Sequence, residues 1–126
     1  MNPHTSIASA DAASGAKTML MVETRSPWES GDAADFLLIV RALLDAGEQV
    51  QLFLIQNGVF WLQQERQQLL QLCSQFDGRL ALCADDMSLE MRGMSHQDAA
   101  HPARICAIDA LVASMAQPNV KTIWHS

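Results

Sequence analysis

Basic residues, paired cysteines and a leader-like apolar run are all scarce in this sequence. Lysine and arginine number 8 against 14 acidic residues, which gives a net charge of −6, and no basic tract could neutralise a phosphate backbone. The three cysteines form no CxxC pair, which suits reduced thiols better than a disulfide framework or a zinc site. We therefore expect a cytoplasmic protein with no metal or other cofactor and with neither nucleic acid nor a membrane as partner.

The first 16 residues lack the apolar core of a signal peptide. They are rich in alanine and serine and contain Pro3 and Gly15. A segment of this composition buries too little apolar surface to offset the entropy of ordering it. We predict a disordered tail over residues 1–16 and a single domain over residues 17–126, which is long enough to form one core.

Short apolar runs alternate with amphipathic segments through the rest of the chain. The runs are apolar on both faces, as in parallel strands covered on both sides, whereas the longer segments repeat at helical spacing. This order predicts an α/β fold, a three-layer α/β/α sandwich with flavodoxin-like topology around a mainly parallel sheet of four to five strands. The predicted strands are 18–22, 48–56, 79–84 and 119–125. The predicted helices are 32–46, 59–76 and 105–116. A short helical turn is predicted at 88–91 and a loop at 94–103.

Two of these helices carry apolar residues that bear on assembly and packing. In helix 32–46, Leu37 and Leu38 fall outside the face that a sheet can cover, which predicts a partner subunit. In helix 105–116 we expect an inward face made of Ile108, Leu111, Val112 and Met115.

The third predicted strand ends in an abrupt change from apolar to reactive and charged side chains. Cys83 is followed by Asp85, Asp86 and Ser88, and then by Arg92. In open α/β sheets, ligands collect at the carboxyl ends of the strands. The two carboxylates disfavour a thiolate, whereas Arg92 and a helix start favour one. Cys83 is therefore a candidate reactive thiol, with a buried structural cysteine as the alternative.

The ends of the first two strands supply further candidates. Arg25 and Trp28 could hold an anion and a flat or apolar group, with packing or a subunit contact as the alternatives. Asn57 begins a turn after the second strand. No glycine-rich loop follows the first strand, which argues against a nucleotide site.

The remaining cysteines and histidines give no defensible metal motif. Cys73 falls on the buried face of its helix, and Cys106 lies away from the main loop cluster. His96 and His101 have no recognised ligand spacing, so we expect surface loop residues.

Several segments resemble the DsrE/DsrF/TusD sulfur-relay family, and this similarity extends over residues 18–125. The resemblance implies a small α/β domain that forms homo-trimers, hexamers or mixed hexamers in the cytoplasm. The segments that carry it are VETRSPWE at 22–29, FLIQNGV at 53–59, CADDMS at 83–88 with Arg92-Gly93, and VKTIWH at 120–125.

The same resemblance implies the activity. In relay members a cysteine after the third strand accepts sulfur as a persulfide and passes it to a sulfur-carrier partner, and Cys83 occupies that region here. Cys83 lies farther from the Arg-Gly pair than the relay cysteine does. The resemblance is compatible with either a sulfurtransferase or a simple sulfur carrier. The alternative is a non-catalytic oligomeric binding or scaffold subunit with a cleft at the strand ends.

Overall fold

The computed structural model describes residues 17–29, 31, 35–99 and 102–125. Five parallel strands form one sheet in the order β4-β3-β2-β1-β5. Each neighbouring pair is in parallel register, and Thr18 of β1, for example, pairs with Gln49 of β2 and Val120 of β5. The strands are β1 (Thr18–Glu23), β2 (Gln49–Leu54), β3 (Leu80–Asp85), β4 (Arg104–Cys106) and β5 (Val120–His125).

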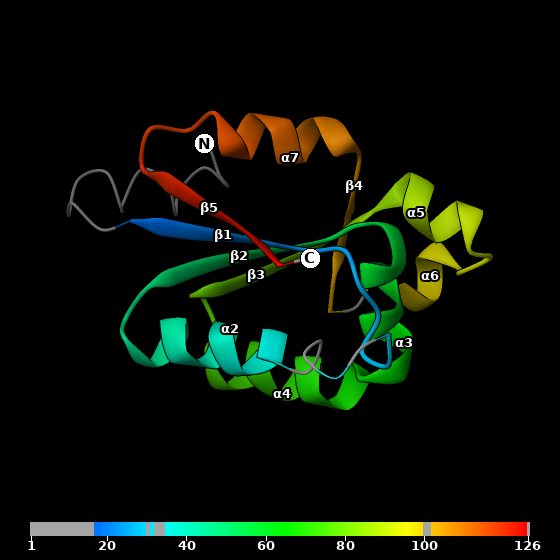
Figure 1. The fold of residues 1–126 in the computed structure, drawn as a ribbon, viewed down its shortest axis with the longest axis horizontal. Coiled ribbons are helices and arrows are strands. Elements are labelled where there is room, and N and C mark those ends of the chain that lie inside the picture. Colours follow the sequence, from blue (N-terminus) through cyan, green and yellow to red (C-terminus); the bar gives the residue numbers. More distant parts are fainter. Residues whose placement is uncertain (1–16, 30, 32–34, 100–101, 126) are drawn as a thin grey trace.

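Helices cover the two faces of this sheet unequally. Two helices, α2 and α4, pack below the sheet in Figure 1, and α7 lies alone above it, while α5 and α6 lie beyond the strand ends. The α/β/α layering and the parallel sheet confirm the predicted fold class. The helices are α2 (Asp35–Asp45), the 3₁₀ helix η1 (Gln56–Phe60), α3 (Trp61–Gln64), α4 (Arg66–Gln75), α5 (Asp86–Met91), α6 (His96–Ala99) and α7 (Ile108–Met115).

The interior strands are apolar on both sides, so their residues divide between two cores. Met19 and Met21 of β1 belong to the larger cluster under α2 and α4. Leu20 and Val22 belong to a smaller cluster beneath α7, together with Phe53, Ile55, Cys83 and Leu111. Because side chains alternate along a strand, this division follows directly from the double-faced runs in the sequence.

Helix α2 follows its predicted pattern within the described residues. Phe36, Val40 and Leu44 are fully buried, and the helix ends before Gly47, whose φ of +92° is the left-handed conformation expected of a terminal glycine. Leu38 is 67% exposed, as its position predicts, whereas Leu37, which was also predicted to lie outside the covered face, is partly buried against the larger core. The start predicted for this helix, at 32–34, and the predicted tail at 1–16 lie outside the described residues.

The prediction of one helix over 59–76 is wrong. The chain makes the 3₁₀ helix η1, then α3, and restarts as α4 after Glu65, whose φ of −130° and ψ of 38° are not helical. Glu65 is neither glycine nor proline, so the sequence carried no signal for this break.

The prediction for residues 94–116 also needs correction. Residues His96–Ala99 form α6, and Arg104–Cys106 form the edge strand β4, so the last helix begins at Ile108 and not at 105. Its predicted inward face is largely exposed. Leu111 is buried, whereas Ile108, Val112 and Met115 are open to solvent. Helix α7 packs on the smaller core through Leu111 and the partly buried Ala110.

Candidate functional site

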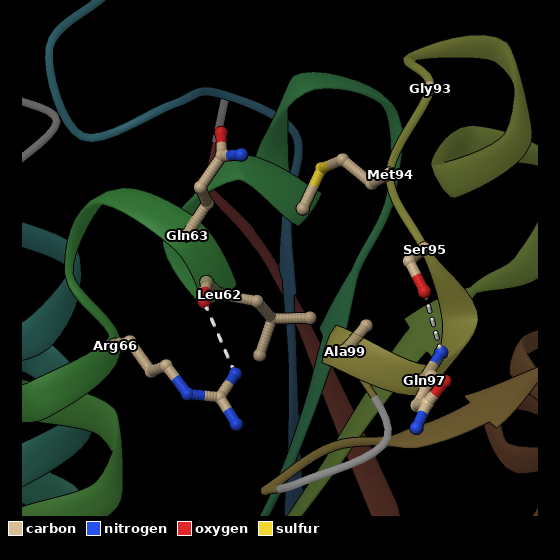
Figure 2. Close-up of a pocket in the computed structure, with 8 residues that line it drawn as sticks. All are labelled: Leu62, Gln63, Arg66, Gly93, Met94, Ser95, Gln97 and Ala99. Carbon is tan, nitrogen blue, oxygen red and sulfur yellow. Dashed lines mark hydrogen bonds between the residues drawn. The ribbon is translucent and has the colours of Figure 1, made fainter.

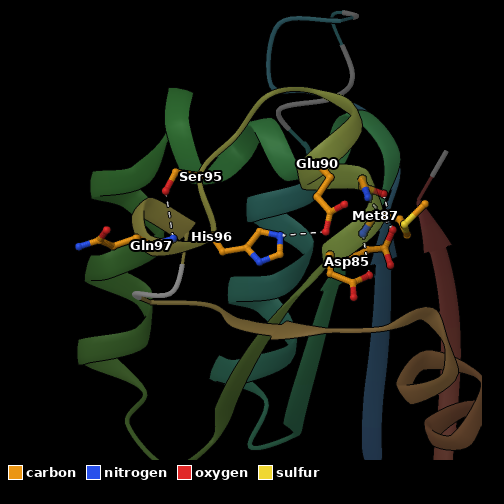
Figure 3. A network of polar contacts seen from close by, with 8 residues as sticks. Asp85, Met87, Glu90, Ser95, His96 and Gln97 are labelled. Atoms are coloured by element: carbon orange, nitrogen blue, oxygen red, sulfur yellow. Dashed lines mark hydrogen bonds and ion pairs between the residues drawn. The ribbon is translucent and has the colours of Figure 1, made fainter.

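The carboxyl ends of β2 and β3 are joined through Ser88. The Ser88 hydroxyl donates to Oδ2 of Asp85 at 2.6 Å and accepts from the backbone N–H of Gln56 at 2.8 Å. Asp85 also accepts from the Ser88 backbone N–H at 3.0 Å, which makes it the N-terminal cap of α5 (Figure 3). Gln56 has a φ of +54°, an unfavourable value for a residue with a side chain, and this bond helps to hold it there.

A second chain of contacts joins three loops at the same edge. Nε of Arg92 donates to Oδ1 of Asn57 at 2.9 Å, and Nδ2 of Asn57 donates to Oε1 of Glu29 at 3.2 Å. The same Glu29 oxygen accepts from the Ser26 backbone N–H at 3.1 Å, which is the bond that the glutamate of a capping box makes. Arg92 thus joins the loops that follow β2 and β3, since its guanidinium also donates to the Ser88 carbonyl at 3.2 Å.

The other sequence-predicted residues lie around this network. The backbone of Arg25 donates to Glu23 and accepts from the indole of Trp61, so its place in the loop is fixed. Trp28 is 69% exposed and lines a pocket of about 240 Å³ with Trp61. Asp86 begins α5 and accepts from the Met87 backbone N–H. The predicted residues other than Cys83 therefore gather at one edge.

Cys83 itself lies inside the smaller core. Its side chain is 4% exposed and is packed with Leu20, Phe53 and Leu111 beneath α7. Burial, and then the neighbouring Cys106, raise the pKa of Cys83 to about 12, against a smaller opposing effect of Arg104. The thiol is therefore protonated at neutral pH. The acidic neighbours considered from the sequence are not the cause, since desolvation dominates.

Cys106 is a neighbour that sequence reasoning placed away from the site. It lies on β4, half-buried against the cluster that contains Cys83. Cys106 raises the pKa of Cys83, and its own thiol donates to the Arg104 carbonyl at 3.8 Å. The prediction missed this pair because it assigned Cys106 to a helix and overlooked the strand that places it beside β3.

A buried carboxylate–imidazole pair was also missed. Oε1 of Glu23, which is fully buried at the end of β1, lies 2.5 Å from Nδ1 of His125 at the end of β5. The His125 ring stacks on Phe36 at 5.9 Å between ring centroids. Burial raises the pKa of Glu23, partly offset by the Arg25 backbone N–H and by His125. Because the two residues are separated by 102 positions, the pairing of β1 with β5 was needed to find them.

The larger pocket lies elsewhere. It encloses about 600 Å³ between α3, α4 and the segment around α6, and Figure 2 shows Leu62, Arg66, Met94 and Gln97 around it. Leu62 belongs to the core on the opposite side of the sheet from Cys83, so this pocket does not lead to Cys83 or Cys106. Within the described residues, no group of three metal-ligating side chains is present and no helix is long and apolar enough to cross a membrane.

Comparison with known proteins agrees with this architecture. No curated protein matches the chain. The model of the DsrE/DsrF-like family matches residues 17–122, which is most of the sequence and includes the carboxyl ends of β1, β2, β3 and β4. This chain is therefore a member of the DsrE/DsrF-like family.

Proposed function

We propose that this protein works in sulfur relay, accepting persulfide sulfur on a cysteine and passing it to a carrier protein, as part of a cytoplasmic homo-oligomer. Membership of the DsrE/DsrF-like family supports a sulfur-relay role. The observation that carries the chemistry is that two free thiols, Cys83 and Cys106, lie on neighbouring strands beside the same core, near the carboxyl ends of β3 and β4. A thiol at such an edge lies where α/β proteins bind ligands.

Access is the main constraint on this function. A sulfur donor must reach the accepting sulfur atom, and the accepting group must ionise, because the thiolate is the nucleophile. Cys83 satisfies neither requirement in the resting fold, since it is buried and its pKa is raised to about 12. Loading therefore needs either movement of α7 away from Cys83 or entry through another thiol.

The test is direct loading of the folded protein. Wild-type protein is incubated with sulfide-derived polysulfide and analysed by intact mass spectrometry, with Cys73→Ser as the matched control because Cys73 lies on α4 under the opposite sheet face. We expect both proteins to gain the mass of one sulfur atom, and reductant to remove it. Absence of any sulfur addition to the folded protein would contradict the relay function.

The burial of Cys83 favours one second candidate, a non-catalytic binding or scaffold subunit. Here the Arg92–Asn57–Glu29 chain and the Asp85–Ser88 bonds would shape a docking surface, with exposed Trp28 beside it. Under this function, Trp28→Ala weakens partner or ligand binding while replacement of any cysteine has no effect. The same loading experiment separates the two functions.

A further inference from the structure

We infer that Cys106 is the thiol through which sulfur enters, with Asp85 as its proton acceptor and Cys83 as its buried neighbour. This inference rests on the proposed sulfur-relay function and assigns roles within it. The sequence pointed to Cys83, but the fold places a more accessible thiol in contact with it.

The register of β3 and β4 brings the three groups together. Asp85 pairs with Cys106, and Cys83 pairs with Arg104 one step earlier along the strands. Residues that pair in neighbouring strands lie about 5 Å apart, and residues two apart along a strand share one face. Cys83, Asp85, Arg104 and Cys106 therefore project from the same side of the sheet, next to the start of α7.

One oxygen atom of Asp85 accepts no hydrogen bond from the described residues, and this supports the assignment of Asp85 as proton acceptor independently of the cysteines. Asp85 is 6% exposed, and both donors that reach it bind Oδ2. No hydrogen bond reaches Oδ1 from any described residue. An unpaired buried carboxylate oxygen is costly, and such a group often marks a functional position. A proton released by Cys106 has an acceptor here.

The electrostatic surroundings of Cys106 also favour a negatively charged sulfur atom. The residue precedes Ala107, the N-terminal cap of α7, and no side-chain hydrogen bond caps that helix. Backbone N–H groups at a helix start carry partial positive charge. Arg104, on the same strand as Cys106, is exposed and opposes the rise in the pKa of Cys83.

The transfer step balances without an external oxidant. The donor is a polysulfide or persulfide, R–S–SH. The Cys106 thiol gives its proton to Oδ1 of Asp85, and the thiolate attacks the outer sulfur of the donor. The Cys106 S–S bond forms as the donor S–S bond breaks, the R–S⁻ thiolate leaves, and the proton on Asp85 returns to it. Cys83 remains a thiol throughout.

The experiment locates the added sulfur in the full chain. Cys83→Ser, Cys106→Ser and the control Cys73→Ser are each loaded with sulfide-derived polysulfide, alkylated, and mapped by peptide mass spectrometry. We expect Cys106→Ser to lose the added sulfur, and Cys83→Ser and Cys73→Ser to keep it on Cys106. Circular dichroism confirms that each variant is folded.

The possible outcomes distinguish failure of this inference from failure of the proposed sulfur-relay function. If sulfur is found on Cys83 and persists in Cys106→Ser, the relay function stands and the inference is wrong. If no protein gains sulfur, the relay function itself is wrong. Loss from both single variants would also overturn the assignment of Cys106 as sole acceptor.

The role of Asp85 has its own readout. Asp85→Asn keeps a side chain that can cap α5 but removes the base, and we expect it to lower the loading rate at neutral pH about a hundredfold. Raising the pH should restore much of that rate, because hydroxide then deprotonates Cys106 directly. A loss that is independent of pH would mean that Asp85 is structural, and would overturn its assignment as proton acceptor.

Discussion

Oε1 of Glu23 lies 2.5 Å from Nδ1 of His125, so the ends of the first and last strands are joined by a buried carboxylate–imidazole contact. The Glu23 side chain is fully buried, and the His125 ring is covered by Phe36. Because β5 is an edge strand that pairs with β1 alone, this contact helps to hold the carboxyl-terminal strand in the sheet.

His125→Ala should therefore strongly destabilise the fold. Removal of the imidazole leaves the Glu23 carboxylate buried without its partner, at a cost of about 3 kcal/mol in the free energy of unfolding. The matched control is His96→Ala, since His96 pairs with Glu90 at 3.7 Å on the exposed surface. That substitution should cost less than about 1 kcal/mol. Urea denaturation measures both, and equal effects would show that the buried contact is not stabilising.

The raised pKa of Glu23 predicts how its contribution changes with pH. Between the unfolded value of about 4.3 and the higher folded value, the folded chain binds more protons than the unfolded chain. The contribution of Glu23 is thus fully present below pH about 4.3 and is lost as the pH rises through the folded pKa. The unfolding free energy of wild type minus that of Glu23→Gln should therefore increase as the pH falls from 7 toward 4. The exposed-site control Glu90→Gln should show little such change, and a flat difference for Glu23→Gln would contradict the prediction.

Gly58 is required by a close backbone approach. A Cβ atom on Gly58 would lie 2.1 Å from the carbonyl oxygen of Glu23, which the backbone cannot accommodate without shifting β1 or η1. Gly58→Ala should lower the free energy of unfolding by more than about 2 kcal/mol. In Gly31→Ala the new methyl group meets no atom of the described residues within 4 Å, so its effect should stay within about 0.5 kcal/mol. Thermal melts of the two variants give the comparison directly.

Self-association through α2 remains a prediction, and the structure sharpens its test. Leu38 on α2 is exposed on one side of the molecule, and Val112 on α7 is exposed on the other. We expect Leu38→Asp to weaken the oligomer in sedimentation velocity while the fold stays intact, because charge is costly to bury in an interface. Val112→Asp tests the opposite face. A wild-type protein that sediments as a monomer at micromolar concentration would show that neither face is an interface.

Strongly patterned segments were predictable from the sequence, whereas the helix break at Glu65, the short elements and the distant pairings were not. The double-faced run at β1 and the spacing of Phe36, Val40 and Leu44 specify buried elements locally. In contrast, Arg104–Cys106 contains three residues, and its apolar positions continue the period of α7, so the pattern looked helical. That one error moved Cys106 away from Cys83.

The clustering of polar residues at the carboxyl ends of the strands was predicted better than the environment of Cys83. Asn57, Ser88 and Arg92 gather as expected because parallel strands end at one edge of a sheet. The burial of Cys83 was left open, because the depth of a strand residue depends on what packs above it. Here that is Leu111 of α7, which lies 28 positions further along the chain.

The brevity of β4 has a kinetic consequence. Its pairing with β3 extends over only three residue pairs at the margin of the sheet, so few hydrogen bonds must break for it to detach. Local opening of this kind occurs at a lower free energy than global unfolding. The rate at which a thiol reagent modifies Cys83 should then report the opening of β4 and α7, with little dependence on denaturant. Amide hydrogens in β4 should exchange on the same timescale, well before those of β1 and β2.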